Sequence, residues 1–195
     1  MDTNVRITND KIKVIFIHGN GGGTAKDNWF PWLSAELGKL GVTVLAQDFP
    51  DPVEAKASIW LPFLEHELKA DDNTILVGHS SGALAAMRYA ETHKLLGTVL
   101  IGACYTDLGY ESEKLSGYYD TPWNWEAIRQ NQNWIAQFAS TDDPFVPIAE
   151  ARYIHEHLQC EYQEYIDQGH FGSDEKHLYE FPELLDLLRR KIVSK

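Results

Sequence analysis

The stretch Thr74-Ile-Leu-Val-Gly78-His79-Ser80-Ser81-Gly82-Ala-Leu-Ala-Ala-Met-Arg-Tyr89 decides the fold of this chain. It begins as a short apolar run with β-branched residues, which is typical of a buried strand. It ends as Ala-, Leu- and Met-rich sequence, which favours a helix. Between the two lies a G-x-S-x-G motif, and such a strand–turn–helix lifts the serine onto a sharp turn with its hydroxyl clear of the sheet. A Gly/Ser turn that merely joins a strand to a helix is the alternative, so this stretch alone predicts only a candidate nucleophile, Ser80.

The same alternation of strand and helix runs along the whole chain. Apolar runs predict strands, and periodic apolar positions predict helices with Pro62 in the first turn of one of them. The predicted strands cover 12–17, 42–46, 74–77, 97–103, 134–139 and 161–167, and the predicted helices cover 29–40, 58–68, 82–93, 148–158 and 183–193. This order predicts an α/β fold with a six-stranded, mostly parallel sheet and helices on both faces. Residues 1–11 are expected to form a polar fringe of a single domain that spans 1–195.

Composition excludes several classes of protein. The 195 residues are 44% hydrophobic and carry a formal charge of −12, which disfavours binding to nucleic acid and to anionic membranes. No apolar run is long enough for a transmembrane helix, and the N-terminus lacks the basic and apolar regions of a secretory signal. The two cysteines, Cys104 and Cys160, form no disulfide framework, so we expect a cytoplasmic protein. The sequence leaves open whether the chain also enters the nucleus.

A serine nucleophile needs a histidine to take its proton and an acid to orient that histidine. In the α/β-hydrolase arrangement the chain order is serine, acid, histidine, and ligands bind at the carboxyl ends of the strands. The fifth predicted strand ends Ser140-Thr141-Asp142-Asp143-Pro144. We predict Asp143 as the acid because Asp-x-x-Val-Pro is common around the acid of α/β-hydrolases, whereas Asp142 would face solvent or cap the turn. An Asx-turn before the proline is the structural alternative for either residue.

The last predicted strand leads into Gly169-His170, and His170 alone among the eight histidines has the expected place. His79 occupies the second position of the G-x-S-x-G motif, where we expect it to pack rather than to react. Ser80, Asp143 and His170 together fit the required order, strand position and residue type. The sequence therefore predicts a catalytic triad of these residues.

The backbone N–H groups for an oxyanion are expected from two places. One is Ser81, directly after the nucleophile, and the other lies in the loop after the first strand. In that loop, His18-Gly19-Asn20-Gly21-Gly22, Asn20 is the first choice and Gly21 the second. The loop has neither a P-loop lysine nor a dinucleotide-binding G-x-G-x-x-G, and no histidine or cysteine spacing suggests zinc. We therefore expect no metal and no cofactor.

At this point the sequence resembles the family of small serine hydrolases that includes retinoblastoma-binding protein 9. The resemblance spans nearly the whole chain. Its landmarks are Gly19–Gly23, Pro50–Pro52, Ser58–Pro62, Gly78–Ala83, Ala86–His93, Ser116–Tyr118, Pro122-Trp123, Ser140–Phe145 and Gly169–Phe171. It implies a compact α/β-hydrolase fold without a large cap domain, and it implies the same three catalytic residues, Ser80, Asp143 and His170.

One departure from that family concerns partner binding. The resembled protein is named for binding a retinoblastoma-type partner through a Leu-x-Cys-x-Glu motif. The matching place here reads Leu68-Lys69-Ala70-Asp71-Asp72, without the cysteine and the glutamate. The motif is not intact, so this partner is not expected.

The segment 104–131 is rich in tyrosine and tryptophan. Its aromatic side chains, among them Tyr118 and Trp123, either wall a substrate pocket over Ser80 or cover the core. The segment is short for a lid over a long lipid chain, so we expect a small ester or amide substrate. The excess of acidic residues favours a cationic substrate, such as an aminoacyl ester or a peptide amine terminus. The alternative to a serine hydrolase is an interaction module that retains the hydrolase fold with little or no activity.

Overall fold

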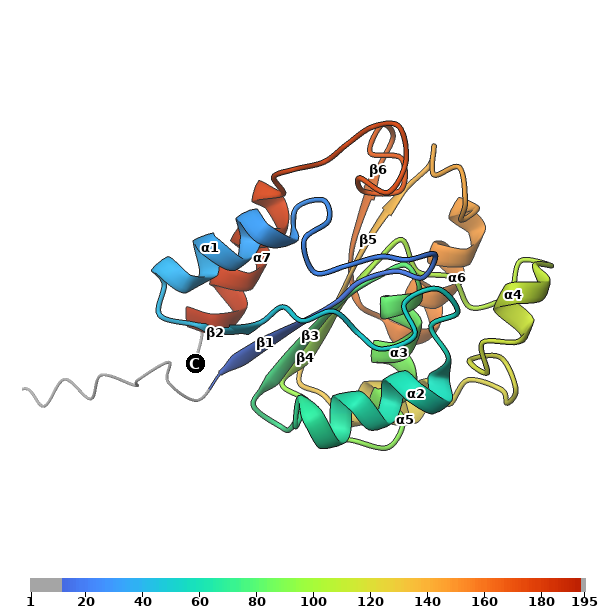
Figure 1. The fold of residues 1–195 in the computed structure, drawn as a ribbon, viewed down its shortest axis with the longest axis horizontal. Coiled ribbons are helices and arrows are strands. Elements are labelled where there is room, and N and C mark those ends of the chain that lie inside the picture. Colours follow the sequence, from blue (N-terminus) through green and yellow to red (C-terminus); the bar gives the residue numbers. More distant parts are fainter. Residues whose placement is uncertain (1–11, 194–195) are drawn as a thin grey trace, which may run out of the picture.

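The computed structural model describes residues 12–193, which build a six-stranded sheet in the order β2-β1-β3-β4-β5-β6 (Figure 1). The strands are β1 (Lys13–Ile17), β2 (Thr43–Leu45), β3 (Thr74–His79), β4 (Gly97–Ile101), β5 (Ile135–Ser140) and β6 (Glu161–Tyr165). All neighbouring strands within this range pair in parallel, which confirms the predicted sheet. The expected polar fringe at 1–11 lies outside the described residues.

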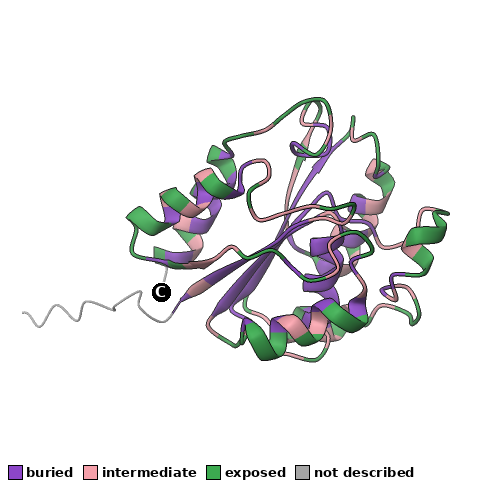
Figure 2. Cartoon of the chain, viewed as in Figure 1, coloured by how far each residue is buried: buried purple, intermediate pink, exposed green. Residues whose placement is uncertain are grey.

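Helices cover both faces of the sheet, as the alternation of strands and helices predicted (Figure 1). Helices α1 (Phe30–Lys39) and α7 (Pro182–Val193) pack on one face, with buried leucines from both against it. The other face carries α2 (Ala57–Pro62), α3 (Ser81–Ala90), α5 (Trp125–Gln130) and α6 (Ile148–Leu158). Because side chains alternate along a strand, Val14 and Phe16 of β1 reach the first layer and Ile15 and Ile17 the second. The four inner strands, β1, β3, β4 and β5, are therefore buried on both sides at the centre of the molecule (Figure 2).

The connection between β4 and β5 adds only two short helices, α4 (Glu111–Lys114) and α5. This confirms the expected absence of a large cap domain within residues 12–193. None of the helices in this range combines the length and the apolar character needed to cross a bilayer.

The predicted helix 58–68 is in fact two segments. Pro62 ends α2 instead of lying in its first turn, and a π-helix, η2 (Phe63–Glu67), follows. The backbone N–H of Leu68 bonds to the carbonyl of Phe63, five residues back. Proline lacks an N–H and interrupts the regular α-helical ladder, which gives a physical reason for the change to the wider turn at this place.

Candidate active site

Ser80 stands on a strained turn between β3 and α3. Its backbone has φ 56° and ψ −123°, a conformation that non-glycine residues rarely adopt. A Cβ on Gly78 would lie 2.3 Å from the carbonyl oxygen of Gly82, and a Cβ on Gly82 would lie 2.2 Å from that of Ile17. Other backbone segments therefore pass too close to Gly78 and Gly82 for either position to carry a side chain. The geometry is that of a serine raised above the sheet at the start of a helix.

His170 and Asp143 meet at the carboxyl edge of the sheet. The Nδ1 atom of His170 lies 2.6 Å from Oδ2 of Asp143, and both side chains are almost completely buried. The other carboxylate oxygen, Oδ1, accepts the backbone N–H groups of Phe145 and Val146 at 2.8 and 3.0 Å. A carboxylate next to Nδ1 requires the hydrogen on that nitrogen, which leaves Nε2 free to accept a proton.

The neighbouring acid, Asp142, has a different environment. Its Oδ1 accepts the hydroxyl of Ser140 at 2.6 Å and the backbone N–H of Gly169 at 2.9 Å, and its Oδ2 pairs with Lys176. The hydrogen bonds from Lys176 and Ser140 hold the pKa of the Asp142 carboxyl well below its usual range. Asp142 therefore anchors the loop that carries His170, whereas Asp143 contacts the imidazole itself.

Ser80 and His170 line the same cavity, together with His79 and Ser81. Within residues 12–193 no hydrogen bond joins the Ser80 hydroxyl directly to the imidazole. Such bonds are often long or misaligned without substrate and tighten when it binds. The structure thus brings the three predicted residues to one place and hydrogen-bonds two of them.

Two backbone N–H groups beside Ser80 have no hydrogen-bond partner among the described residues, those of Asn20 and Ser81. The N–H of Gly21, the second choice for the oxyanion, already bonds to the carbonyl of Val53 at 3.1 Å. Buried His18 fixes the start of this loop, since its Nε2 accepts the N–H of Phe49 at 2.9 Å. The arrangement favours Asn20 over Gly21 as the second oxyanion donor.

The cavity has a volume of about 260 Å³, which is small for a ligand pocket. Its walls are mostly apolar and include Leu84, Cys104, Leu108, Tyr110, Phe145 and Val146. Among residues 12–193, Glu113 is the one carboxylate in its lining, and its Oε1 accepts the side-chain amide of Asn20 at 2.8 Å. Partial burial raises the pKa of Glu113, while the hydrogen bond from Asn20 opposes that rise. A substrate in this cavity would meet an apolar wall with one carboxyl group.

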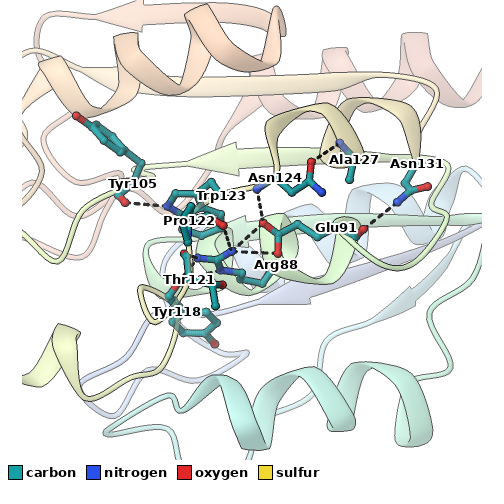
Figure 3. A network of polar contacts seen from close by, with 10 residues as sticks. All are labelled: Arg88, Glu91, Tyr105, Tyr118, Thr121, Pro122, Trp123, Asn124, Ala127 and Asn131. Atoms are coloured by element: carbon teal, nitrogen blue, oxygen red, sulfur yellow. Dashed lines mark hydrogen bonds and ion pairs between the residues drawn. The ribbon is translucent and has the colours of Figure 1, made fainter.

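Two residues predicted for the pocket lie elsewhere. Tyr118 is fully buried in the core, and Trp123 lines a separate surface hollow with Tyr105. Both residues contact Arg88 of α3 (Figure 3). Its Nε donates to the carbonyl of Tyr118 at 2.8 Å, and its guanidinium lies 3.7 Å from the centre of the Trp123 ring. These residues thus fasten the segment 104–131 to α3 and cover the core, which is the second of the two alternatives that the sequence leaves open, and neither lines the cavity.

The cavity also contains residues that the sequence analysis did not assign to it. Glu113, Leu108 and Cys104 come from the connection after β4, which has no strand or helix periodicity to predict their direction. Burial raises the pKa of the Cys104 thiol to about 12, so this group is not a thiolate near neutral pH. Among residues 12–193, no three or more His, Cys, Asp or Glu side chains gather as a metal site would require.

Comparisons with known proteins show the family and the fold of the chain. A family model described as serine hydrolase matches residues 14–190. The serine hydrolase RBBP9 of Rattus norvegicus is 47% identical over 167 residues, which are 85% of this chain and 90% of that protein. The crystal structure of the ydeN gene product from B. subtilis is 27% identical, with a TM-score of 0.84 over 94% of this chain and 100% of that chain. Est1E from Butyrivibrio proteoclasticus, at 14% identity, shares the fold with a TM-score of 0.70 over 94% of this chain and 89% of its own.

Proposed function

The chain belongs to the family of small serine hydrolases that includes retinoblastoma-binding protein 9, and on that premise we propose that it hydrolyses a small ester or amide through an acyl-enzyme on Ser80. The observation that carries this proposal is the buried hydrogen bond of 2.6 Å between Nδ1 of His170 and Asp143, in a cavity that Ser80 shares. In such an arrangement the imidazole accepts the proton of the hydroxyl group. The carboxylate orients the imidazole and stabilises the imidazolium that forms.

In the first half of the reaction, Oγ of Ser80 attacks the acyl carbon, and Nε2 of His170 takes the hydroxyl proton. Asp143 holds the imidazole in the required tautomer and stabilises the imidazolium. The backbone N–H groups of Asn20 and Ser81 bind the oxyanion of the tetrahedral intermediate. His170 then returns the proton to the leaving alcohol or amine, and the acyl group remains on Ser80.

In the second half, a water molecule gives a proton to His170 and attacks the acyl-enzyme. The second tetrahedral intermediate collapses, the carboxylic acid leaves, and Ser80 recovers its hydrogen from His170. The cavity volume of about 260 Å³ supports a short acyl group. Glu113 adds a local reason for the cationic substrate that the overall charge favours, since its carboxylate lies in the cavity itself.

The proposal is tested by labelling the full chain with a fluorophosphonate probe and by measuring hydrolysis of p-nitrophenyl esters of increasing chain length. We expect stoichiometric labelling, loss of labelling in Ser80→Ala, and kcat/KM values that fall from butyrate to longer acyl chains. Ser81→Ala keeps its backbone N–H and is expected to remain labelled, which separates the two adjacent serines. Wild-type protein without Ser80-dependent labelling would instead support an inactive interaction module on a hydrolase fold.

A further inference from the structure

Side chains accept three consecutive backbone N–H groups of the loop that carries His170, those of Gln168, Gly169 and His170. The N–H of Gln168 bonds to Oγ of Ser140 at 3.0 Å, and the N–H of His170 bonds to Oδ2 of Asp174 at 2.8 Å. The loop is also strained, because Phe171 has φ 53°. A strained conformation of a non-glycine residue persists only where its surroundings fix it. The position of the imidazole therefore depends on the groups that hold this loop.

Two buried aromatic N–H groups contact carbonyls of the same loop, and one of these carbonyls, that of His170, also accepts the backbone N–H of Ser173 at 3.3 Å. Nε2 of His79 lies 2.9 Å from the carbonyl oxygen of His170, and Nε1 of Trp29 donates to the carbonyl oxygen of Phe171 at 3.2 Å. A carbonyl only accepts, so Nε2 of His79 must carry the hydrogen. Burial, followed by the charge of His170, lowers the pKa of His79 to about 3. His79 is thus a neutral, permanent donor across the working pH range of a hydrolase.

His79 differs from Trp29 because it also touches the imidazole of His170. The centres of the two rings are 4.9 Å apart at an angle of 48°, and the His79 ring packs edge-on against Trp29 on another side. His79 is the last residue of β3, directly before Ser80, and it is only 2% exposed. One rigid strand end therefore carries both the nucleophile and a ring that contacts the histidine.

We propose that His79 is a positioning residue for hydrolysis, which fixes the backbone carbonyl and the ring plane of His170 relative to Ser80. The proposal rests on the proposed function for its kinetic consequence, but its geometric content concerns His170 alone. Through this contact the nucleophile and the proton acceptor share one support, although His79 and His170 are 91 residues apart in the sequence. A shift of about 1 Å between reacting groups can cost about 100-fold in rate, so such a support has kinetic value.

The test compares His79→Phe, which keeps a ring and removes the donor, with His79→Gln, whose amide nitrogen reaches about as far as Nε2. We expect His79→Phe to lower kcat by about 10- to 100-fold with KM changed by less than about 3-fold. His79→Gln is expected to restore kcat to within about 3-fold of wild type. A low-field proton resonance from the His170–Asp143 hydrogen bond is expected in wild type and His79→Gln, and to be broadened or shifted in His79→Phe. If His79→Phe does not fold, His79→Asn, whose amide is too short, takes its place.

A matched control is Tyr89→Phe, which removes a hydrogen bond of 2.9 Å from a buried side chain to the backbone of Ala70, away from the cavity. It is expected to lower stability and leave kcat per folded molecule unchanged. Equal kcat and an unchanged low-field resonance in His79→Phe and wild type would overturn the proposal and leave His79 a core residue. If wild type has no Ser80-dependent activity, the proposed function fails, and the resonance alone then decides whether His79 positions His170.

Discussion

Substitution of Gly102 by alanine is expected to displace the imidazole of His170 in the candidate site. Gly102 follows β4, has φ 58°, and its backbone passes directly beside the imidazole. A Cβ at this position would lie 2.8 Å from Cε1 and 3.0 Å from Nδ1 of His170. Gly102→Ala therefore adds one methyl group against the proposed general base without removing any hydrogen-bonding group.

The expected magnitude follows from these distances. Ordinary contacts of a Cβ begin at 3.4 Å, so the imidazole must move by about 0.6 Å from its place at 2.8 Å. If a 1 Å misplacement costs about 100-fold and the free energy scales with distance, Gly102→Ala lowers kcat by roughly 15-fold. The left-handed backbone adds a loss of stability of about 1–2 kcal/mol, which is independent of catalysis.

Gly41→Ala is the matched control, because Gly41 has φ 75° and a Cβ there would meet nothing within 4 Å. Both variants are expected to lower the free energy of unfolding, measured in urea, by similar amounts. Only Gly102→Ala is expected to slow p-nitrophenyl ester hydrolysis and fluorophosphonate labelling. A Gly102→Ala enzyme with the kcat of Gly41→Ala would show that the position of the His170 ring does not limit the reaction, and the reasoning would fail.

Four further predictions concern single side chains. Asp143→Asn removes the carboxylate at Nδ1 of His170 and is expected to lower kcat by about 10³- to 10⁴-fold. Asp142→Asn leaves the contact between Asp143 and the imidazole intact and is expected to lower kcat by less than about 10-fold. Because the folded-state pKa of Asp142 is lowered, its stabilisation is present above its unfolded pKa and is lost as pH falls, so Asp142→Asn is expected to flatten the acid limb of the stability profile. Glu113→Gln keeps an acceptor for Asn20 and is expected to reduce the preference for amino-acid esters over matched neutral esters. Arg88→Met leaves buried carbonyls without their donor and is expected to lower the free energy of unfolding by about 3 kcal/mol.

The measurements for these variants are steady-state kinetics at fixed folded fraction and urea unfolding from acid to neutral pH. Equal kcat in Asp143→Asn and Asp142→Asn would contradict the assignment of the acid. An unchanged slope of stability against pH in Asp142→Asn would refute the role of its carboxylate in anchoring the loop. Equal rates of wild-type hydrolysis of charged and neutral esters would refute the proposed preference for a cationic substrate. A free energy of unfolding in Arg88→Met equal to that of wild type would show that Arg88 is not needed for stability.

The sequence predicts the sheet well because the signal for it is local. Short apolar runs followed by amphipathic helices can only bury both faces of the strands as a parallel sheet. Once the strands are parallel, the residues after β3, β5 and β6 must come to one edge, and Asp143 and His170 do meet there. The choice of Asp143 over Asp142 rested on a short pattern, whereas in the structure the partners of Asp142 are Gly169 and Lys176.

The walls of the cavity were harder to predict, because tertiary contacts decide them. Tyr118 and Trp123 are aromatic, as pocket residues often are, yet both contact Arg88 of α3 and neither lines the cavity. Glu113 reaches the cavity from a four-residue helix, α4, and its partner Asn20 lies 93 residues away in the sequence. The periodicity of apolar residues predicts helices and strands, but it does not predict a contact between two residues that are far apart in the sequence.

The hydrogen bond from His79 to the carbonyl of His170 has a consequence for the order in which the site forms during protein synthesis. During translation, His79 is added to the chain 91 residues before His170. At a synthesis rate of about 5–20 residues per second, that interval lasts about 5–18 seconds. Under the proposed mechanism, the nascent chain lacks the proton acceptor for Ser80 through this time. Under the proposed mechanism, the catalytic residues therefore come together only in a late step, when the His170 loop packs against the end of β3.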